Sequence, residues 1–273
     1  MKFGITLHTT DSAMSPVALA CEVEARGFDS FYVPEHTHIP VSRRTPPPSG
    51  EAELPEMYLR TYDPYIALSA AAAVTTTLRL GTGVALPAQH DAIVLAKEIA
   101  TLDLVSQGRF VWGIGFGWNR EEMESHGVDP RERRDVVRET VQAMRALWGN
   151  DVAEFHGRHI DFEPCWQWPK PVQRPGPPVL IGAAAGPKAF AAIAAYGDGW
   201  IPIGGGGIRA ALPELHRAVE AAGRDPATLS IVPLGVTLDS GKVDYYESLG
   251  CTEVVFRVPT APRDQVMPVL DEA

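Results

Sequence analysis

Residues 78–115, LRLGTGVALPAQHDAIVLAKEIATLDLVSQGRFVWGIG, contain the pattern that decides the fold. Short apolar runs at 78–85 and 109–115 flank a stretch, 92–106, whose apolar residues recur every three or four positions. Runs that are apolar on both faces predict strands of a parallel sheet covered by helices, and the intervening periodicity predicts a helix. The stretch therefore predicts one strand–helix–strand unit of a parallel α/β fold.

The same alternation continues in both directions along the chain of 273 residues. Further strands are predicted at 2–7, 29–34, 178–183, 199–203, 229–236 and 253–258. Further helices are predicted at 16–26, 63–76, 131–148, 187–196, 210–222, 242–249 and 263–272. Eight strand candidates in a chain of this length predict a (β/α)8 TIM barrel, as a single domain over residues 1–273, rather than an open doubly wound sheet.

Two segments interrupt the alternation and are expected to be insertions. Residues 37–60 are rich in Pro, Arg and Glu, and residues 149–177 carry several Pro and aromatic residues. Long loops inside a compact domain usually serve as lids or binding loops, or are disordered. For residues 40–60, a lid and a dimer contact are both open interpretations.

The composition argues against several classes of protein. A formal net charge of −10 makes the chain a poor general binder of nucleic acid. Three distant cysteines, an odd number, argue against a disulfide framework or a structural zinc site, and we expect no metal. The chain starts with a strand-like MKFGITL rather than a signal peptide, and no apolar run is long enough to span a membrane. We expect a cytoplasmic protein.

A titratable cluster follows the second predicted strand, in FYVPEHTHIP at 31–40. The active sites of TIM barrels lie at the C-terminal ends of their strands. Glu35 and His36 are therefore predicted to project into the mouth of the barrel, with His36 exchanging a proton and Glu35 tuning it. The alternative is a solvated surface turn after Pro34, and for His38 both interpretations stay open.

Other strand ends carry glycines, aromatic residues and a turn suited to anions. Gly81 and Gly83 indicate a bulge or a close approach of the backbone to a ligand. The stretch GIGFGW at 113–118 does not have the spacing of a dinucleotide-binding motif. Small residues before Pro187, followed by Lys188, predict either a phosphate site at a helix N-terminus or an ordinary tight turn.

Together these segments resemble the luciferase-like monooxygenase superfamily, specifically its flavin- and deazaflavin-dependent oxidoreductases. The resemblance rests on GFDSFYVPEHTHIP (27–40), on 63–122 from DPYIAL to GFGWNREE, on FHGRHIDF (155–162), on PKPVQRPGPPVLIGA (169–183) and on AAYGDGWIP (194–202). These run in family order up to about residue 205. The resemblance implies a (β/α)8 barrel that binds FMN or the deazaflavin coenzyme F420 at its C-terminal mouth.

The resemblance also implies roles for single residues. Glu35 and His36 match the acidic residue and histidine beside the reactive ring. The remaining matches are a cofactor-supporting bulge, commonly with a non-proline cis peptide, at Gly83–Val84; a flanking loop at Phe116, Gly117 and Trp118; and a phosphate-holding turn at Ala185, Gly186 and Lys188. A phosphate and polyglutamate tail would also suit Arg43 and Arg44. Some deazaflavin sugar-phosphate dehydrogenases have a threonine in this loop and, two residues later, a proton-donating glutamate; this chain has Phe116 and Trp118 at those positions, which indicates a different, more apolar substrate.

The implied function is hydride transfer between F420 and a small, apolar organic substrate, with the protein positioning the two partners and handling one proton. Two alternatives remain: an FMN-dependent monooxygenase, and a non-catalytic barrel that binds a cofactor or ligand. We expect the protein to act as a homodimer on a small molecule, without nucleic acid or membrane partners.

Overall fold

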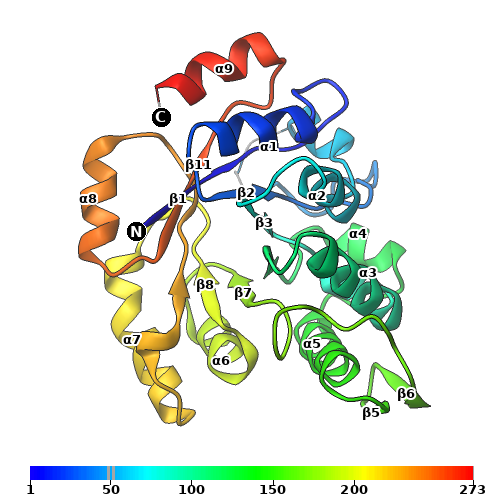
Figure 1. The fold of residues 1–273 in the computed structure, drawn as a ribbon. Coiled ribbons are helices and arrows are strands. Elements are labelled where there is room, and N and C mark those ends of the chain that lie inside the picture. Colours follow the sequence, from blue (N-terminus) through cyan, green and yellow to red (C-terminus); the bar gives the residue numbers. More distant parts are fainter. Residues whose placement is uncertain (48–49, 51–52, 273) are drawn as a thin grey trace.

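A parallel sheet forms the centre of the molecule in the computed structural model, which describes residues 1–47, 50 and 53–272 (Figure 1). Its nine strands are β1 (Lys2–Thr6), β2 (Ser30–Val33), β3 (Arg79–Thr82), β4 (Phe110–Ile114), β7 (Val179–Gly182), β8 (Gly199–Ile201), β9 (Ser230–Ile231), β10 (Leu234–Val236) and β11 (Glu253–Arg257). They pair in the order β10-β11-β1-β2-β3-β4-β7-β8-β9, and every pair is parallel. The parallel α/β plan is therefore confirmed.

The stretch 229–236 is not the single strand that the sequence predicts. It forms β9 and β10, which are the two ends of the pairing ladder. Pro233 between them has no N–H to donate, and Gly235 takes a φ of 76°, so a regular strand cannot run through this stretch. The prediction of eight strands in a fully closed barrel is wrong here. The sheet is TIM-barrel-like: regular strand geometry stops at Val232 and Pro233, although Val232 N donates to Trp200 O at 2.9 Å and Pro233 O accepts from Val255 N at 2.8 Å.

The helices lie outside the curved sheet (Figure 1). The eight predicted helices are found as α1 (Pro16–Ala25), α2 (Pro64–Ala72), α3 (Ala92–Val105), α5 (Arg133–Gly149), α6 (Pro187–Tyr196), α7 (Ile208–Ala221), α8 (Ser240–Ser248) and α9 (Arg263–Asp271). The sequence analysis missed α4 (Arg120–Ser125) and the 3₁₀ helices η1 (Glu56–Arg60), η2 (Pro87–Gln89) and η3 (Pro226–Thr228). Both α4 and η1 contribute to the candidate site described below.

Polar side chains determine where the first helices begin. Ser15 Oγ accepts a hydrogen bond of 3.2 Å from Ala18 N, and Asp63 Oδ1 accepts one of 2.8 Å from Ile66 N. Asp91 accepts from two N–H groups in the first turn of α3. Such caps satisfy N–H groups that have no partner inside the helix. They hold the N-termini of α1, α2 and α3, each of which follows a strand of the sheet.

The inner face of the sheet is filled by one side chain from most strands. These residues are Tyr32, Val111, Leu180, Ile201, Val232, Leu234 and Val255. Small barrels are filled by inward-facing side chains in this way. A Cβ at Gly81 would overlap the Tyr32 ring, so packing against Tyr32 accounts for this glycine without a ligand. A ligand therefore has to bind beyond the strand ends.

The two predicted insertions differ in structure. Residues 149–177 contain an antiparallel hairpin, β5 (Ala153–His156) with β6 (Asp161–Cys165), which packs beside α5 rather than forming a loop (Figure 1). The described part of 37–60 includes η1, which contributes Met57 and Tyr58 to the cavity at the strand ends. Pro48, Ser49, Glu51 and Ala52 of this insertion, with Ala273, lie outside the described residues.

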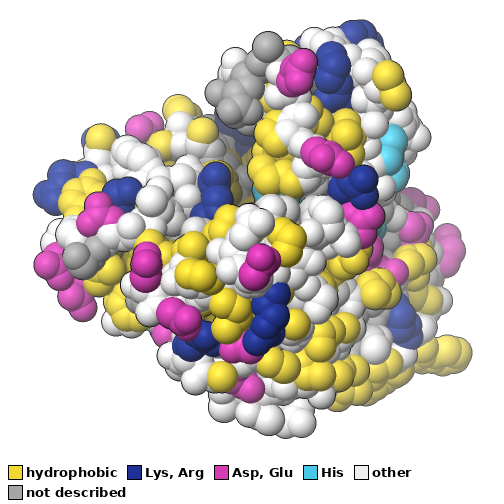
Figure 2. Space-filling view, turned by 90° about the horizontal axis from the view of Figure 1, so that it is seen from above, with side chains coloured by type: hydrophobic (Ala, Val, Ile, Leu, Met, Phe, Trp, Pro, Cys, Tyr) yellow, Lys and Arg dark blue, Asp and Glu magenta, His cyan; other side chains and the backbone are white. Residues whose placement is uncertain are grey.

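Positive and negative side chains are interspersed on the face shown in Figure 2, between apolar areas. This mixture agrees with the ordinary share of charged residues in the composition, 21%. Of the helices in the described part of the chain, none combines the length and the apolar character that crossing a bilayer requires.

Candidate active site

A cavity of about 530 Å³ lies at the carboxyl ends of the strands. Its walls include residues 6–8, 34–36, 83–84, 115–118 and 182–184, which follow or end β1, β2, β3, β4 and β7. The wall is mostly apolar, with a few polar groups among the aliphatic and aromatic side chains, as ligand sites usually are. Active sites of TIM-barrel enzymes occupy this position, so the cavity is the candidate active site.

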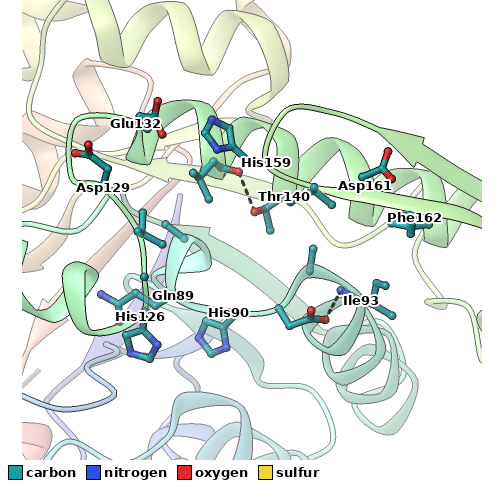
Figure 3. A pocket seen from close by; sticks show the side chains of 17 residues that line it. Gln89, His90, Ile93, His126, Asp129, Glu132, Thr140, His159, Asp161 and Phe162 are labelled. Atoms are coloured by element: carbon teal, nitrogen blue, oxygen red, sulfur yellow. Dashed lines mark hydrogen bonds between the residues drawn. The ribbon is translucent and has the colours of Figure 1, made fainter.

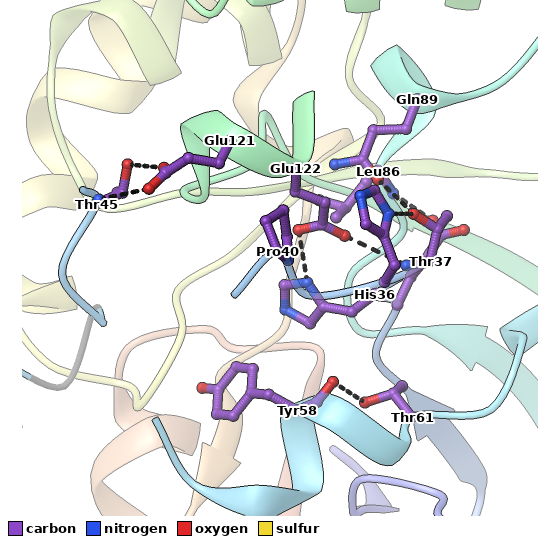
Figure 4. A network of polar contacts seen from close by, with 12 residues as sticks. His36, Thr37, Pro40, Thr45, Tyr58, Thr61, Leu86, Gln89, Glu121 and Glu122 are labelled. Carbon is purple, nitrogen blue, oxygen red and sulfur yellow. Dashed lines mark hydrogen bonds and ion pairs between the residues drawn. The ribbon is translucent and has the colours of Figure 1, made fainter. Parts of the chain in front are cut away.

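His36 lines the cavity and is held by a carboxylate from α4. Its Nδ1 lies 2.9 Å from Oε2 of Glu122 (Figure 4), and Glu122 Oε1 accepts a hydrogen bond of 3.2 Å from Thr37 N. The centroids of the Tyr58 and Trp118 rings lie 5.3 and 5.8 Å from the centroid of the His36 ring. Nε2 of His36 has no hydrogen-bond partner among the described residues. A carboxylate at Nδ1 holds a proton there and leaves Nε2 for a ligand.

Glu35 also borders the cavity, but its carboxylate is engaged elsewhere. Oε1 lies 2.6 Å from Nε2 of His90, and Oε2 accepts a hydrogen bond of 2.6 Å from Leu86 N. The backbone N–H of Glu35 donates to Val84 O at 3.3 Å. Although burial opposes the shift, the hydrogen bond with Glu35 raises the pKa of His90. Glu35 thus holds the loop after β3, and the carboxylate paired with His36 is Glu122, which the sequence analysis did not identify.

The peptide bond between Gly83 and Val84 is cis, in agreement with the expectation from the resemblance. Both residues line the cavity. A Cβ at Gly182 would overlap the Val84 side chain, and a Cβ at Gly115 would lie 2.7 Å from Val84 Cγ2, so the missing side chains make room for Val84. A Cβ at Gly83 itself would lie 2.6 Å from Leu234 Cδ1. A larger residue at Gly83 would therefore disturb the core as well as the cavity.

Phe116, Gly117 and Trp118 line the cavity, and the two aromatic residues form one of its walls. The Arg134 guanidinium carbon lies 4.0 Å from the centroid of the Phe116 ring, a cation–π arrangement. Gly117 takes a φ of 75°, a conformation that favours glycine. Flat aromatic walls of this kind suit a planar ring system.

Ala185, Gly186 and Lys188 are outside the cavity wall, which includes Gly182, Ala183 and Ala184. Ala185 and Lys188 are exposed, and Gly186 precedes α6 without a capping side chain. In the first turn of α6, Pro187 has no N–H, and the N–H groups of Ala189 and Phe190 both donate to Gly186 O at 3.0 Å. The N–H of Lys188 is therefore the group of this turn that is left at the rim for an anion. The assignment of this turn to a phosphate stays a prediction.

His8 is a cavity residue that the sequence analysis missed. It follows β1, and its ring centroid lies 5.0 Å from that of Tyr58. Burial, then the nearby charges of His36 and Arg257, lower the pKa of His8 to about 4, so its imidazole is neutral near pH 7. The expectation that site residues follow the C-terminal ends of strands, which located His36, also applies to His8, because His8 directly follows the predicted strand 2–7.

Three arginines line the cavity without a carboxylate partner among the described residues: Arg133, Arg134 and Arg257. Nε of Arg133 and Nη1 of Arg134 are buried and make no hydrogen bond there. By contrast, ion pairs involve Arg26, Arg44, Arg60, Arg79, Arg131, Arg138, Arg145, Arg158 and Arg263. Buried cationic groups without partners are unfavourable, so the cavity suits an anionic ligand.

The insertion 37–60 supplies part of the cavity wall. Its 3₁₀ helix η1 places Tyr58 between the rings of His8 and His36. Glu121 of α4 accepts hydrogen bonds from Thr45 N at 3.0 Å and Thr45 Oγ1 at 2.5 Å (Figure 4). Burial opposes ionisation of Glu121, but the hydrogen bonds from Thr45 lower its pKa to about 2. Glu121 thus anchors the insertion as a carboxylate and is poorly suited to donate a proton.

A second hollow, of about 440 Å³, includes His90 in its wall (Figure 3). His126, His159 and several carboxylates also line it, among them Glu132 and Asp161. None of the predicted site residues belongs to this hollow. Because Glu35 borders the cavity and His90 borders the second hollow, the Glu35–His90 pair lies between the two.

His38, for which two interpretations were open, lies outside the cavity wall. It is exposed, and its Nδ1 lies 3.0 Å from Oγ1 of Thr37. Its ring packs against that of His126, with centroids 5.3 Å apart. The geometry favours a surface role for His38.

The family model of the luciferase-like monooxygenases matches residues 1–238. The chain belongs to this family. An uncharacterised protein of Mycobacterium tuberculosis is 48% identical over 267 residues, covering 97% of this chain and 94% of that protein. A phthiodiolone/phenolphthiodiolone dimycocerosates ketoreductase of Mycobacterium kansasii is 33% identical over 219 residues, covering 77% of this chain and 59% of that enzyme.

Two solved structures share the fold of this chain. The monooxygenase RslO1 from Streptomyces bottropensis superimposes with a TM-score of 0.80 at 22% identity, covering 99% of this chain and 97% of that one. An F420-dependent secondary alcohol dehydrogenase, in complex with an F420–acetone adduct, gives a TM-score of 0.69 at 23% identity, covering 86% and 69%. The fold of this chain is therefore shared with a monooxygenase and with an F420-dependent dehydrogenase.

Proposed function

We propose that this protein is an oxidoreductase that transfers a hydride between coenzyme F420 and a ketone or secondary alcohol with an apolar body. The observation that carries the proposal is His36, which is held at Nδ1 by Glu122 while its ring faces the cavity between Tyr58 and Trp118. A histidine held in this way can exchange a proton with a substrate oxygen. A single domain over 1–273, a homodimer and a cytoplasmic location stay predictions.

The cavity residues fit a planar ring that carries an anionic chain. Val84 on one side and the rings of Phe116 and Trp118 on another offer apolar surfaces for the ring. The buried, unpaired nitrogens of Arg133 and Arg134 offer charge-assisted hydrogen bonds to an anion. Ala185, Gly186 and Lys188 would add the N-terminus of α6 and one positive charge at the rim.

When bound, the deazaflavin supplies or accepts a hydride at its ring carbon C5. His36 does the accompanying proton chemistry. In ketone reduction, its imidazolium donates the Nε2 proton to the carbonyl oxygen as the carbonyl carbon gains the hydride, and the product is the neutral alcohol. Glu122 stabilises the imidazolium and keeps the ring oriented. Tyr58 and Trp118 hold the imidazole and exclude water from it.

We choose F420 over FMN on three grounds: the consecutive residues Glu35 and His36 that match the resemblance, the insertion 37–60, and the arginines that line the cavity. The ketone is suggested by the ketoreductase relative, which shares 33% of its residues with this chain over the matched region. Since this chain covers 59% of that enzyme, its substrate is not carried over. The FMN-dependent monooxygenase and the non-catalytic barrel are the competing outcomes of the experiment.

The experiment is a pair of fluorescence titrations of the purified protein, one with F420 and one with FMN. We expect F420 to bind more tightly and the reduced complex to be oxidised by members of a panel of apolar ketones, followed at 420 nm (roughly the absorption maximum of the oxidised ring). Tight FMN binding with oxygen consumption would instead support the monooxygenase. Binding of F420 without reaction of any ketone or secondary alcohol would support the non-catalytic barrel.

A further inference from the structure

Two more hollows continue from the cavity along the N-termini of α4 and α5. The first, of about 280 Å³, shares Gly117, Trp118 and Arg133 with the cavity. The second, of about 520 Å³, shares Arg120 and Arg133 with the first. Arg133 therefore lines all three hollows, and the two outer hollows, which adjoin the cavity through the shared side chains, are together called the groove.

The side chains of this groove leave an excess of positive charge. Arg44, Arg120, Arg131 and Arg133 line it, and its carboxylates are Glu124 and Asp129. Both carboxylates are already paired: Glu124 with Arg44, and Asp129 with Arg131 at 2.5 Å.

Arg120 and Arg133 are the groove cations that remain unneutralised. No carboxylate in the described part of the chain lies within ion-pair distance of either one. The Arg133 guanidinium donates to Pro130 O, and its Nε is buried without a hydrogen-bond partner. Next to it, burial and the charge of Arg133 lower the pKa of Arg134, because two neighbouring cations disfavour each other's charge. An anion bound between Arg133 and Arg134 would relieve this repulsion.

Arg43 and Arg44, the basic residues considered from the sequence, are less suited to this role. Arg43 donates to the backbone oxygens of Ser42 and Pro40, and Arg44 pairs with Glu124. The available cations are Arg120 on α4 and Arg133 on α5, together with Arg134 in the cavity wall.

We propose that this groove binds the anionic tail of the cofactor, a chain of carboxylates joined through a phosphodiester to the ring portion. The proposal rests on the proposed function, since the ring has to occupy the cavity for its tail to enter the groove. Arg133 and Arg134 would meet the phosphodiester where the groove leaves the cavity. Arg120 would meet the carboxylates farther out. Such a groove selects a tailed deazaflavin over FMN, whose only anionic group is its terminal phosphate.

The experiment compares the dissociation constants of three ligands: F420, FMN and a tailless ring. The tailless ring is the deazaflavin with its ribityl chain but without the phosphate and the tail. We expect F420 to bind at least tenfold more tightly than the tailless ring at low salt, and the difference to shrink at about 0.5 M salt through screening. Arg120→Gln and Arg133→Gln should each lower the affinity for F420 about tenfold while leaving that for the tailless ring unchanged.

Arg158→Gln is the matched control, because Arg158 is exposed, pairs with Glu132 and lies outside all three hollows. We expect it to bind both ligands like the unaltered protein. Arg133→Lys, together with a thermal melt, separates loss of charge from loss of folding, since Lys keeps the charge and should recover part of the affinity.

Equal affinities for F420 and the tailless ring at low salt would overturn the groove while leaving the proposed function intact. The groove would also be overturned if Arg158→Gln weakened F420 binding as much as Arg120→Gln. If neither deazaflavin bound and FMN did, the proposed cofactor would be wrong and the groove would lose its ligand.

Discussion

Two histidine–carboxylate pairs lie on opposite sides of the end of β2. In one, His36 Nδ1 lies 2.9 Å from Glu122, and in the other, His90 Nε2 lies 2.6 Å from Glu35. Glu35 and His36 are consecutive, and consecutive residues of an extended chain point in opposite directions. His36 consequently faces the cavity, whereas Glu35 turns toward the loop after β3.

The difference between the pairs lies in what surrounds them, since their chemistry is the same. His36 has Tyr58 and Trp118 as ring neighbours and an Nε2 without a partner among the described residues. Both carboxylates are engaged at both oxygens, Glu122 by His36 and Thr37 N and Glu35 by His90 and Leu86 N, but His90 lines the second hollow and not the cavity. A histidine–carboxylate pair is therefore suited to proton transfer only where one ring nitrogen is left facing a ligand site.

The largest expected effect comes from His36→Ala. If His36 is the proton donor, turnover of a ketone should fall about a hundred- to ten-thousand-fold, which corresponds to roughly 3–5 kcal/mol in the barrier. Affinity for F420 and the melting temperature should change little. Stopped-flow oxidation of the reduced cofactor measures the loss. Turnover at the unaltered rate would show that the proton comes from another group.

Substituting the carboxylates of the two pairs should give different results. Glu122→Gln removes the charge that stabilises the His36 imidazolium and keeps the ring oriented, so we expect turnover to fall about ten- to a hundred-fold. In Glu35→Gln, turnover should stay within about threefold, but the free energy of unfolding should fall by roughly 1–3 kcal/mol, because the half-buried His90 loses its charged partner.

Turnover rates and urea denaturation of both variants test this contrast. Glu122→Asp serves as the control that keeps the charge and alters the geometry. The distinction between the pairs would be contradicted if Glu35→Gln lowered turnover as much as Glu122→Gln.

The smallest effect concerns His8 and the pH dependence of stability. Its pKa is about 4 in the folded protein and 6.5 in the unfolded chain, so between these values the unfolded chain binds a proton that the folded protein does not. Lowering the pH from 7 to 5 should therefore reduce the free energy of unfolding by about 1–2 kcal/mol through His8.

His8→Asn isolates this contribution, because every other titrating group remains. The pKa of His90 is raised in the folded protein, so its stabilising contribution is present at low pH and is lost as the pH rises through this raised pKa. Its effect on stability therefore has the opposite sign to that of His8. Urea denaturation of both proteins at pH 7 and pH 5 measures the difference. Identical pH dependence in the two proteins would mean that His8 is not shifted in the folded state.

The sequence by itself determined the parallel α/β plan, the eight long helices and the location of the site. Apolar runs bounded by glycine and proline, and periodic stripes between them, depend on local residue order and can be read directly. Strand ends in such a fold converge at one edge, so the order of the segments was enough to place His36, Gly83 and Phe116 together. The expectation of a cis peptide bond at Gly83–Val84 came from the resemblance instead, and that bond is cis.

Only the tertiary structure decided which carboxylate hydrogen-bonds to His36, how completely the sheet closes on itself, and which arginines have no carboxylate partner among the described residues. Glu122 is separated from His36 by 86 positions and lies on a six-residue helix without a strong local signal. The division of residues 229–236 into β9 and β10 depends on how β9 pairs with β8 and how β10 pairs with β11. Whether Arg133 forms an ion pair depends on where every carboxylate near it lies in the folded chain. These features arise from contacts between segments distant in sequence, and residue order alone does not specify their distances or burial.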